Sequence, residues 1–260
     1  MNKTNLDKLK ELAQPFFLKA KKKESNTLIL LVHGFGASCT ETRPLAEFLA
    51  GEGYDCYGIL LSGHGSSSKD LDKIKWTDWI NDIKDAYDKY SKKYDKVIIG
   101  GVSLGGALSL YFGSLFHVNG IFTINAFYEF KPLHKIITPL LAIFKKHIPR
   151  SEQRITWYIE NNLFSYSYDS TYGAYQILKF HKRLHKNIKK ISVPVLLTQS
   201  QTDQTVKPKN AEKIYKKLQC KKKLVKIPQG DHILTVDENR ELAFKEIIAF
   251  IRDINYTNSP

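Results

Sequence analysis

Six short apolar runs recur along this chain, and helical patterns separate most of them. The runs cover residues 27–33, 54–60, 96–102, 120–126, 193–199 and 223–228. The helical patterns occupy residues 41–52, 76–92, 104–116, 208–218 and 237–253. Continuous apolar runs of this length are typical of strands that are buried on both faces. The alternation therefore predicts an α/β fold, with a mostly parallel central sheet flanked by helices.

One long segment, residues 128–188, interrupts this alternation. It shows no strand pattern, and its apolar spacing favours helices that Pro139 and Pro149 would end or kink. An all-helical insertion is most simply a cap over the edge of the sheet where ligands bind. We therefore expect a core formed by residues 1–127 and 189–260, with a helical cap inserted between its two parts.

Composition restricts the classes of function. The chain has 40 Lys and Arg against 26 Asp and Glu, a formal net charge of +14. The lysines are spread along the chain without a nucleic-acid-binding motif, so we expect no nucleic-acid partner. Cys39, Cys56 and Cys220 lack zinc-ligand spacing and are odd in number, which favours free thiols in a reducing compartment. No signal-peptide pattern or membrane-length apolar run appears, and the expected location is cytoplasmic.

A serine lies between glycines where the third apolar run ends. The sequence "GVSLG", residues 101–105, fits G-x-S-x-G directly after a predicted strand and directly before a predicted helix. A sharp strand-to-helix turn brings the backbone so close on either side that Gly101 and Gly105 are needed, and it projects the hydroxyl of Ser103. The pattern is short, and Ser103 as a simple helix N-cap is the alternative.

Two later stretches supply the partners that a nucleophilic serine needs. Asp203 follows one predicted strand in "VPVLLTQSQTDQTVKP", and His232 follows the next in "KLVKIPQGDHILTVD". Serine, acid and histidine at strand ends in this order are the pattern of α/β-hydrolases. Asp231 is the alternative acid, although a residue adjacent to the histidine usually points away from its ring. We expect Ser103, Asp203 and His232 to form a catalytic triad.

An oxyanion hole requires two backbone amides near the serine. One comes from the residue after the nucleophile, Leu104, and the other from a loop after an early strand. The stretch "LVHGFGAS", residues 31–38, supplies that loop, and its glycines let the backbone curl beneath a substrate. The amide of Phe35 is the candidate second donor, and His33 is expected to be a structural bridge.

With these residues in place, the chain resembles the α/β-hydrolase superfamily, and within it the small bacterial-type carboxylesterases and monoacylglycerol lipases. The resemblance spans nearly the whole chain after the first dozen residues. It rests on an ordered set of motifs: "PFFLKA", "LVHGFGAS", "LAEFLAGEGYDCYGILLSGHG", "WTDWINDI", "GVSLGG", "QTDQTVKP" and "GDHILTVD". The family often has proline where this chain has Ser62, a departure that touches no catalytic residue.

The resemblance implies a serine esterase that works through an acyl-enzyme, with a small ester or lipid as substrate and neither metal nor organic cofactor. The predicted cap matches the family in position but hardly in sequence. Its apolar stretch, residues 133–144, suits an acyl tunnel for a short- to medium-chain ester such as a monoacylglycerol, and equally suits plain packing. A lysophospholipase, a thioesterase and a non-catalytic binding module on the same scaffold are the alternatives.

Basic residues gather in and after the predicted cap. They include Lys145, Lys146 and Arg150, and the run 179–190, "KFHKRLHKNIKK", has no acidic residue. Such a rim is expected to attract an anionic membrane surface. The oligomeric state is not indicated by any pattern in the sequence.

Overall fold

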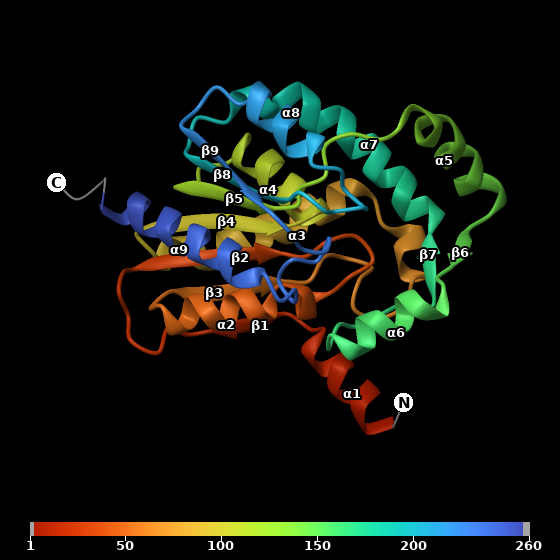
Figure 1. Cartoon of the computed structure of the whole chain (residues 1–260), viewed down its shortest axis with the longest axis horizontal. Coiled ribbons are helices and arrows are strands. Elements are labelled where there is room, and N and C mark those ends of the chain that lie inside the picture. Colours follow the sequence, from red (N-terminus) through yellow and green to blue (C-terminus); the bar gives the residue numbers. More distant parts are fainter. Residues whose placement is uncertain (1–2, 257–260) are drawn as a thin grey trace.

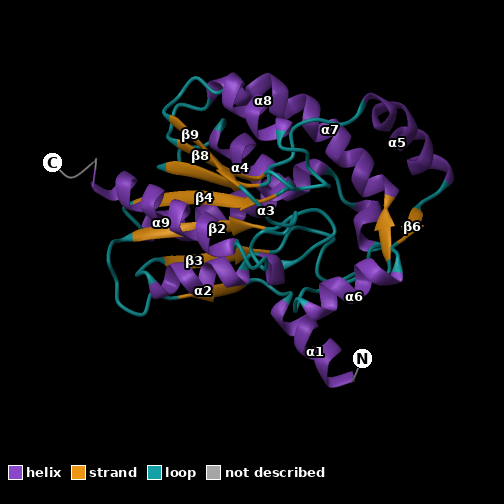
Figure 2. Ribbon diagram, viewed as in Figure 1, coloured by secondary structure: helices purple, strands orange, loops and turns teal. Residues whose placement is uncertain are grey.

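The computed structural model describes residues 3–256 and contains one main sheet (Figures 1 and 2). Its strands are β1 Phe16–Leu18, β2 Thr27–Val32, β3 Asp55–Ile59, β4 Lys96–Val102, β5 Gly120–Ile124, β8 Val195–Ser200 and β9 Lys222–Ile227. The helices are α1 Lys3–Leu12, α2 Arg43–Gly51, α3 Trp76–Tyr90, α4 Leu104–Gly113, α5 Pro132–Phe144, α6 Glu152–Glu160, α7 Thr171–Asn187, α8 Lys209–Lys217 and α9 Arg240–Tyr256. A small second sheet pairs β6 His147–Pro149 with β7 Tyr168–Ser170.

The main sheet is parallel except at one edge, where β1 runs antiparallel to β3. The predicted α/β fold, a mostly parallel sheet flanked by helices, is therefore confirmed. All six predicted strands are present, with ends that shift by one or two residues. The antiparallel β1 was not predicted, because three residues are too few for a periodic pattern.

The central strand β2 shows why helices cover both faces of the sheet. Its six residues are all buried, and alternate side chains enter two different cores. Leu28, Leu30 and Val32 pack in the core that contains α3 and α4, whereas Ile29 and Leu31 pack with α2 and α9. In Figure 1, α2 and α9 lie in front of the sheet and α3 and α4 behind it. An unbroken apolar run, as from Leu28 to Val32, is what burial on both faces favours.

The strand order β1-β3-β2-β4-β5-β8-β9 places β2 between β3 and β4. The chain leaving β2 enters α2 on one face, and the chain leaving β4 enters α4 on the other. The two connections therefore diverge beyond the paired ends of β2 and β4, where Val32 lies opposite Gly101. Such a switch point opens a crevice at the carboxyl ends of the strands.

The segment between β5 and β8 contains α5, α6 and α7, and it differs from the all-helical expectation in one respect. His147–Pro149 pairs antiparallel with Tyr168–Ser170 as β6 and β7. Strands of three residues, one ending in proline, give no strand pattern in the sequence. α7 joins this segment to the core, since Phe180 and Leu184 are fully buried in the cluster that includes α3 and α4. None of the described helices is long and apolar enough to cross a bilayer.

Candidate active site

Ser103 occupies a strained turn between β4 and α4. Its φ of 53° and ψ of −114° lie outside the regions that side chains normally adopt. The turn is held on both sides, because the Ser103 amide donates to the Ile124 carbonyl at 2.9 Å and the Ser103 carbonyl accepts from the Phe127 amide at 3.2 Å. The half-buried side chain of Ser103 reaches a cavity at the edge of the sheet.

The flanking glycines are explained by close approach to β2. A Cβ built on Gly101 or on Gly105 would collide with the carbonyl oxygen of Val32. No side chain could therefore replace hydrogen at either position without separating β4 and α4 from β2. Two glycines around one serine are thus a steric consequence of placing that serine above the switch point.

Asp203 and His232 meet at the carboxyl ends of β8 and β9. His232 Nδ1 lies 2.7 Å from Asp203 Oδ2, and the Asp203 side chain is completely buried. The other carboxylate oxygen, Oδ1, accepts hydrogen bonds from the amides of Thr205 and Val206 at 2.7 and 2.9 Å. These bonds fix the carboxylate so that Nδ1 of His232 donates to it and Nε2 is left to act as a base.

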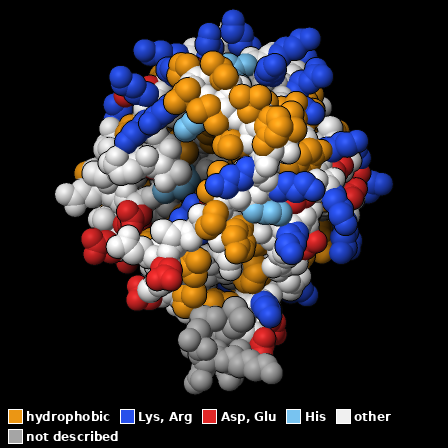
Figure 3. All heavy atoms as spheres, turned by 90° about the vertical axis from the view of Figure 1, so that its right-hand side faces the viewer, with side chains coloured by type: hydrophobic (Ala, Val, Ile, Leu, Met, Phe, Trp, Pro, Cys, Tyr) orange, Lys and Arg blue, Asp and Glu red, His pale blue; other side chains and the backbone are white. Residues whose placement is uncertain are grey.

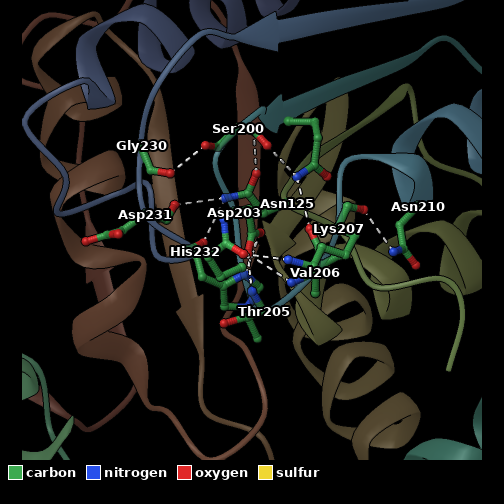
Figure 4. A network of polar contacts seen from close by, with 12 residues as sticks. Asn125, Ser200, Asp203, Thr205, Val206, Lys207, Asn210, Gly230, Asp231 and His232 are labelled. Atoms are coloured by element: carbon green, nitrogen blue, oxygen red, sulfur yellow. Dashed lines mark hydrogen bonds and ion pairs between the residues drawn. The ribbon is translucent and has the colours of Figure 1, made fainter. Parts of the chain in front are cut away.

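The alternative acid is directed elsewhere. The Asp231 carboxylate points away from the His232 ring in Figure 4, and among the ion pairs of the described residues the only carboxylate on that ring is Asp203. Ser103 and His232 line one cavity, although no hydrogen bond joins their side chains within residues 3–256. Catalytic hydrogen bonds often become short only when substrate is bound.

Asn125, which was not predicted from the sequence, connects the loop that carries Asp203 (the acid loop) to the loop that carries His232 (the histidine loop) (Figure 4). It follows β5 with a φ of 49°, and its Oδ1 accepts from the Ser200 amide at 2.8 Å. Its Nδ2 donates to the backbone carbonyls of His232 and Asp231 at 2.8 and 3.2 Å. An asparagine directly after a buried strand was the available signal, because asparagine tolerates the left-handed region.

The loop after β2 lies against Ser103. A Cβ on Gly34 would be 3.4 Å from Ser103 Cβ, and both Phe35 and Leu104 line the cavity. Leu104 begins α4, whose first amides and dipole favour negative charge above Ser103. His33 is fully buried and bridges two loops, since its Nδ1 lies 2.8 Å from the Gly34 carbonyl and its Nε2 accepts from the Leu61 amide.

A second carboxylate, Glu41, faces the same cavity and was also missed. It ends a short 3-10 helix, Cys39–Glu41, and its Oε2 accepts the amide hydrogen of Gly34 at 2.5 Å. Burial raises the pKa of this carboxyl to about 7, although the Gly34 hydrogen bond and the charges of His232 and Arg150 act in the opposite direction. Glu41 can therefore change its charge near neutral pH.

The cavity has a volume of about 480 Å³ and a lining of mixed character. It includes the apolar side chains of Phe127, Phe130 and Ile177 and the charged side chains of Arg154 and Lys207. Such a mixture suits a ligand with an apolar part and a polar part. Among the described residues, no cluster of His, Cys, Asp or Glu has the geometry to hold a metal ion.

A family model described as serine aminopeptidase, S33, matches residues 23–239. The chain belongs to this α/β-hydrolase family. A carboxylesterase of Bacillus subtilis (strain 168) is 26% identical over 239 residues, covering 90% of this chain and 96% of that protein. A thermostable monoacylglycerol lipase of Bacillus sp. (strain H-257) is 26% identical over 227 residues, covering 85% and 89%. This α/β-hydrolase is thus an enzyme similar to carboxylesterases and monoacylglycerol lipases.

Solved structures agree with this assignment. A structure from work on LipS and LipT, two metagenome-derived lipolytic enzymes, superimposes with a TM-score of 0.83 at 25% identity, covering 93% of this chain and 98% of that one. The monoacylglycerol lipase of Paleococcus ferrophilus has a TM-score of 0.74 at 18% identity, covering 93% and 99%, and shares the fold. The similarity therefore spans the core and the inserted segment of this hydrolase together.

Asn125→Asp should misplace His232 while keeping the acceptor for Ser200. The new carboxylate oxygen would face the two carbonyls to which Nδ2 now donates, so the histidine loop should shift. Because small displacements of catalytic groups are expensive, we expect kcat to fall by about tenfold to a hundredfold with KM little changed. Steady-state kinetics on a chromogenic ester would measure this. Asn187→Asp, which removes an amide donor to Arg183 at the end of α7, is the matched control; equal kinetics in both variants would contradict the role of Asn125.

The charge on Glu41 should make stability depend on pH. Its pKa is about 7 in the folded chain and 4.5 ordinarily, so between these values the folded protein holds a proton that the unfolded chain has lost. Stability should therefore fall as pH rises from about 4.5 to 7, on the order of 2–3 kcal/mol relative to Glu41→Gln, and the difference should stay level above pH 7. Urea unfolding of both proteins across this range would measure it. If the stability difference between the two proteins did not depend on pH, the raised pKa of Glu41 would be contradicted. Among the described residues, His232, Arg150 and Tyr158 are the ionisable groups that act on Glu41.

Proposed function

We propose that this hydrolase cleaves carboxylic esters through a covalent acyl intermediate on Ser103. The observation that carries the proposal is the convergence of three features on one cavity. They are the strained serine turn, the His232 ring on a buried Asp203, and the backbone of Phe35 and Leu104. These are the parts that serine-dependent acyl transfer requires.

In the proposed mechanism, Ser103 Oγ attacks the ester carbonyl while Nε2 of His232 removes its proton. Asp203, fixed by two backbone amides, keeps the ring in one tautomer and stabilises the imidazolium that forms. The amides of Phe35 and Leu104 stabilise the tetrahedral oxyanion. His232 then protonates the leaving alcohol, and water enters by the same steps to release the acid and regenerate Ser103.

The substrate we propose has a short- to medium-chain acyl group on a small polar alcohol, as in a monoacylglycerol. The apolar lining residues Phe127, Phe130 and Ile177 suit the acyl chain, and the charged lining residues Arg154 and Lys207 suit the alcohol. The names of the two Bacillus relatives, a carboxylesterase and a monoacylglycerol lipase, favour the same choice. Lysophospholipids and thioesters are the competing substrates of the same residues.

The test is hydrolysis of p-nitrophenyl esters from acetyl to palmitoyl, beside 1-monoacylglycerols, lysophosphatidylcholine and acyl thioesters. We expect Ser103→Ala to lower activity by about a thousandfold or more and to abolish labelling by a fluorophosphonate probe. Ser114→Ala, at the far end of α4, is the matched control because its hydroxyl bonds the Tyr111 carbonyl and no other group among residues 3–256. A folded wild type that neither hydrolyses esters nor takes the label would instead favour a binding module.

We further propose that α5 rests on an anionic lipid surface. None of its residues is buried, and Phe144 is 82% exposed. The exposed apolar residues, which we call the α5 ridge, are Leu133, Ile136, Ile137, Leu140, Ile143 and Phe144. Exposed apolar surface of this extent marks an interaction site. Figure 3 shows hydrophobic and basic side chains together on this face of the molecule.

The charge around the ridge favours lipid over a second copy of this basic chain. Lys131, Lys135, Lys145 and Lys146 are all exposed, and no acidic residue occurs between Glu129 and Glu152. An apolar helix surface framed by lysines suits the boundary between acyl chains and anionic headgroups. The ridge also adjoins the cavity, whose lining includes the first residues of α5. A lipid substrate would thus enter from the surface on which the enzyme rests.

Vesicle flotation with the Ser103→Ala protein would test this contact. We expect binding to phosphatidylcholine vesicles that contain phosphatidylglycerol and weaker binding to phosphatidylcholine alone, since each lysine near an anionic surface contributes about 1 kcal/mol. Ile143→Glu with Phe144→Glu should abolish binding, whereas Leu242→Glu on the exposed side of α9 should not. Equal binding to both vesicles would contradict the proposal. A dimer in solution that dissociates on Phe144→Glu would identify a second copy as the occupant.

A further inference from the structure

The loop that carries the Phe35 amide is held from two sides by buried side chains of opposite charge. Glu41 accepts the amide hydrogen of Gly34 at 2.5 Å, one residue before Phe35. Arg150 Nη2 donates to the carbonyl of Gly36 at 3.0 Å, one residue after it. Glu41 comes from the core, directly before α2, whereas Arg150 follows β6 in the inserted segment.

The Arg150 guanidinium is buried and is held by polar and aromatic contacts. Its side chain is only 1% exposed, and its Nε and Nη2 both contact Asp169 Oδ1, at 2.7 and 2.6 Å. The rings of Tyr158 and Tyr166 lie 5.5 and 5.4 Å from the guanidinium carbon. Burying a guanidinium is expensive unless its bonds are satisfied, yet Nη1 has no partner in the described part of the chain. Packing alone does not account for this choice of side chain.

The loop and the two charged groups fit one another closely. Gly36 has a φ of 62°, and a Cβ there would collide with Arg150 Nη2. A Cβ on Gly34 would lie 3.0 Å from Glu41 Oε2. The inserted segment makes a second hydrogen bond to the same loop, because the Tyr166 hydroxyl donates to the Ala37 carbonyl at 3.3 Å. The peptide that carries the Phe35 amide has the Gly34 carbonyl at its other end, 2.8 Å from His33 Nδ1. Glu41 and Arg150 fix the backbone before and after this peptide, so they hold the ends about which it could turn.

We infer that Arg150 and Glu41 are positioning residues for catalysis, which hold the backbone on either side of Phe35 and so keep its amide in place for the oxyanion. This inference rests on the proposed function. Preorganised donors stabilise a transition state because they need not reorganise when charge develops. The inserted segment then contributes to the chemical step as well as to enclosing the acyl chain. Losing Arg150 should lower kcat on every ester, whatever its acyl length.

A merely structural role of Arg150 predicts a different result. If Arg150 only attached the inserted segment to the core, its loss would raise KM for long acyl chains that touch this segment. Turnover of an acetyl ester, which has little acyl surface to bind, would then stay near the wild-type value. The ratio of the effects on kcat and KM separates the two roles.

The experiment compares Arg150→Gln, Arg150→Lys and Glu41→Ala, which removes the acceptor of the Gly34 amide, on p-nitrophenyl acetate and octanoate. For Arg150→Gln we expect kcat to fall by about tenfold to a hundredfold on both esters, with KM for the acetate little changed. Inhibition by a boronic acid, which forms a tetrahedral adduct on the serine, should weaken in parallel. Arg150→Lys should recover part of kcat, because lysine still offers one donor to the Gly36 carbonyl.

The surface pair Arg252 and Glu52 supplies matched variants, Arg252→Gln and Glu52→Ala, which should leave kcat unchanged. Unchanged kcat on the acetate with a raised KM for the octanoate in Arg150→Gln would overturn the inference. If Arg150→Gln does not fold by near-ultraviolet circular dichroism, unchanged kcat and boronic-acid affinity in folded Glu41→Ala would overturn it equally. Failure of the proposed function is distinct, because wild-type ester hydrolysis would then be absent or would survive Ser103→Ala.

Discussion

The close approach of β4 and α4 to the carbonyl end of β2 is the constraint on which the candidate site depends. Gly101 and Gly105 allow the Val32 carbonyl to lie where a Cβ would otherwise stand. This contact forces the strained backbone of Ser103 and also brings the Gly34 loop against the serine. The close approach of these elements at the switch point of the sheet thus places both the Ser103 hydroxyl and the potential oxyanion site. Separating the strands by the width of a methyl group would remove both.

The other half of the site depends on polar bonds between loops. Asp203 and His232 leave neighbouring strands, and Asn125 joins the backbones of both loops from a third strand. The Thr235 hydroxyl, just after the histidine, donates to the carbonyl of Glu41 at 2.6 Å. The histidine loop is therefore connected to the same short helix that holds the oxyanion loop. Buried polar bonds of this kind fix one arrangement, because breaking any of them leaves an unsatisfied group.

Features that a short stretch of sequence specifies could be predicted, whereas most of those that depend on residues far apart in sequence could not. The turn at Ser103 is local, so five consecutive residues specify it, and the strands before Asp203 and His232 are recognisable from their apolar runs. Asn125 and Arg150 gave no comparable signal, because each bonds a backbone group more than 100 residues away in sequence. The expectation that Arg150 belongs to a basic rim facing a membrane was wrong, since its side chain is buried. Glu41 is only seven residues from Gly34, but no pattern around it indicated a buried carboxylate. The short β6 and β7 were missed because pairing, and not periodicity, creates them. Substrate choice is similarly hard to read, since the α5 ridge is an apolar pattern that a buried helix would share.

The placement of buried charge connects stability with catalysis in this chain. Burying a carboxyl or a guanidinium usually lowers stability relative to apolar residues of similar size, even when the group has polar partners. Here Glu41 and Arg150 bond to the residues on either side of Phe35, and no direct bond joins them to each other among the described contacts. The Arg150 guanidinium is paired with Asp169, yet its Nη1 has no partner in the described part of the chain. Proteins commonly tolerate such destabilising groups where function needs them. An apolar pair would serve stability better, so the presence of Glu41 and Arg150 is most simply explained by the backbone that they hold in place.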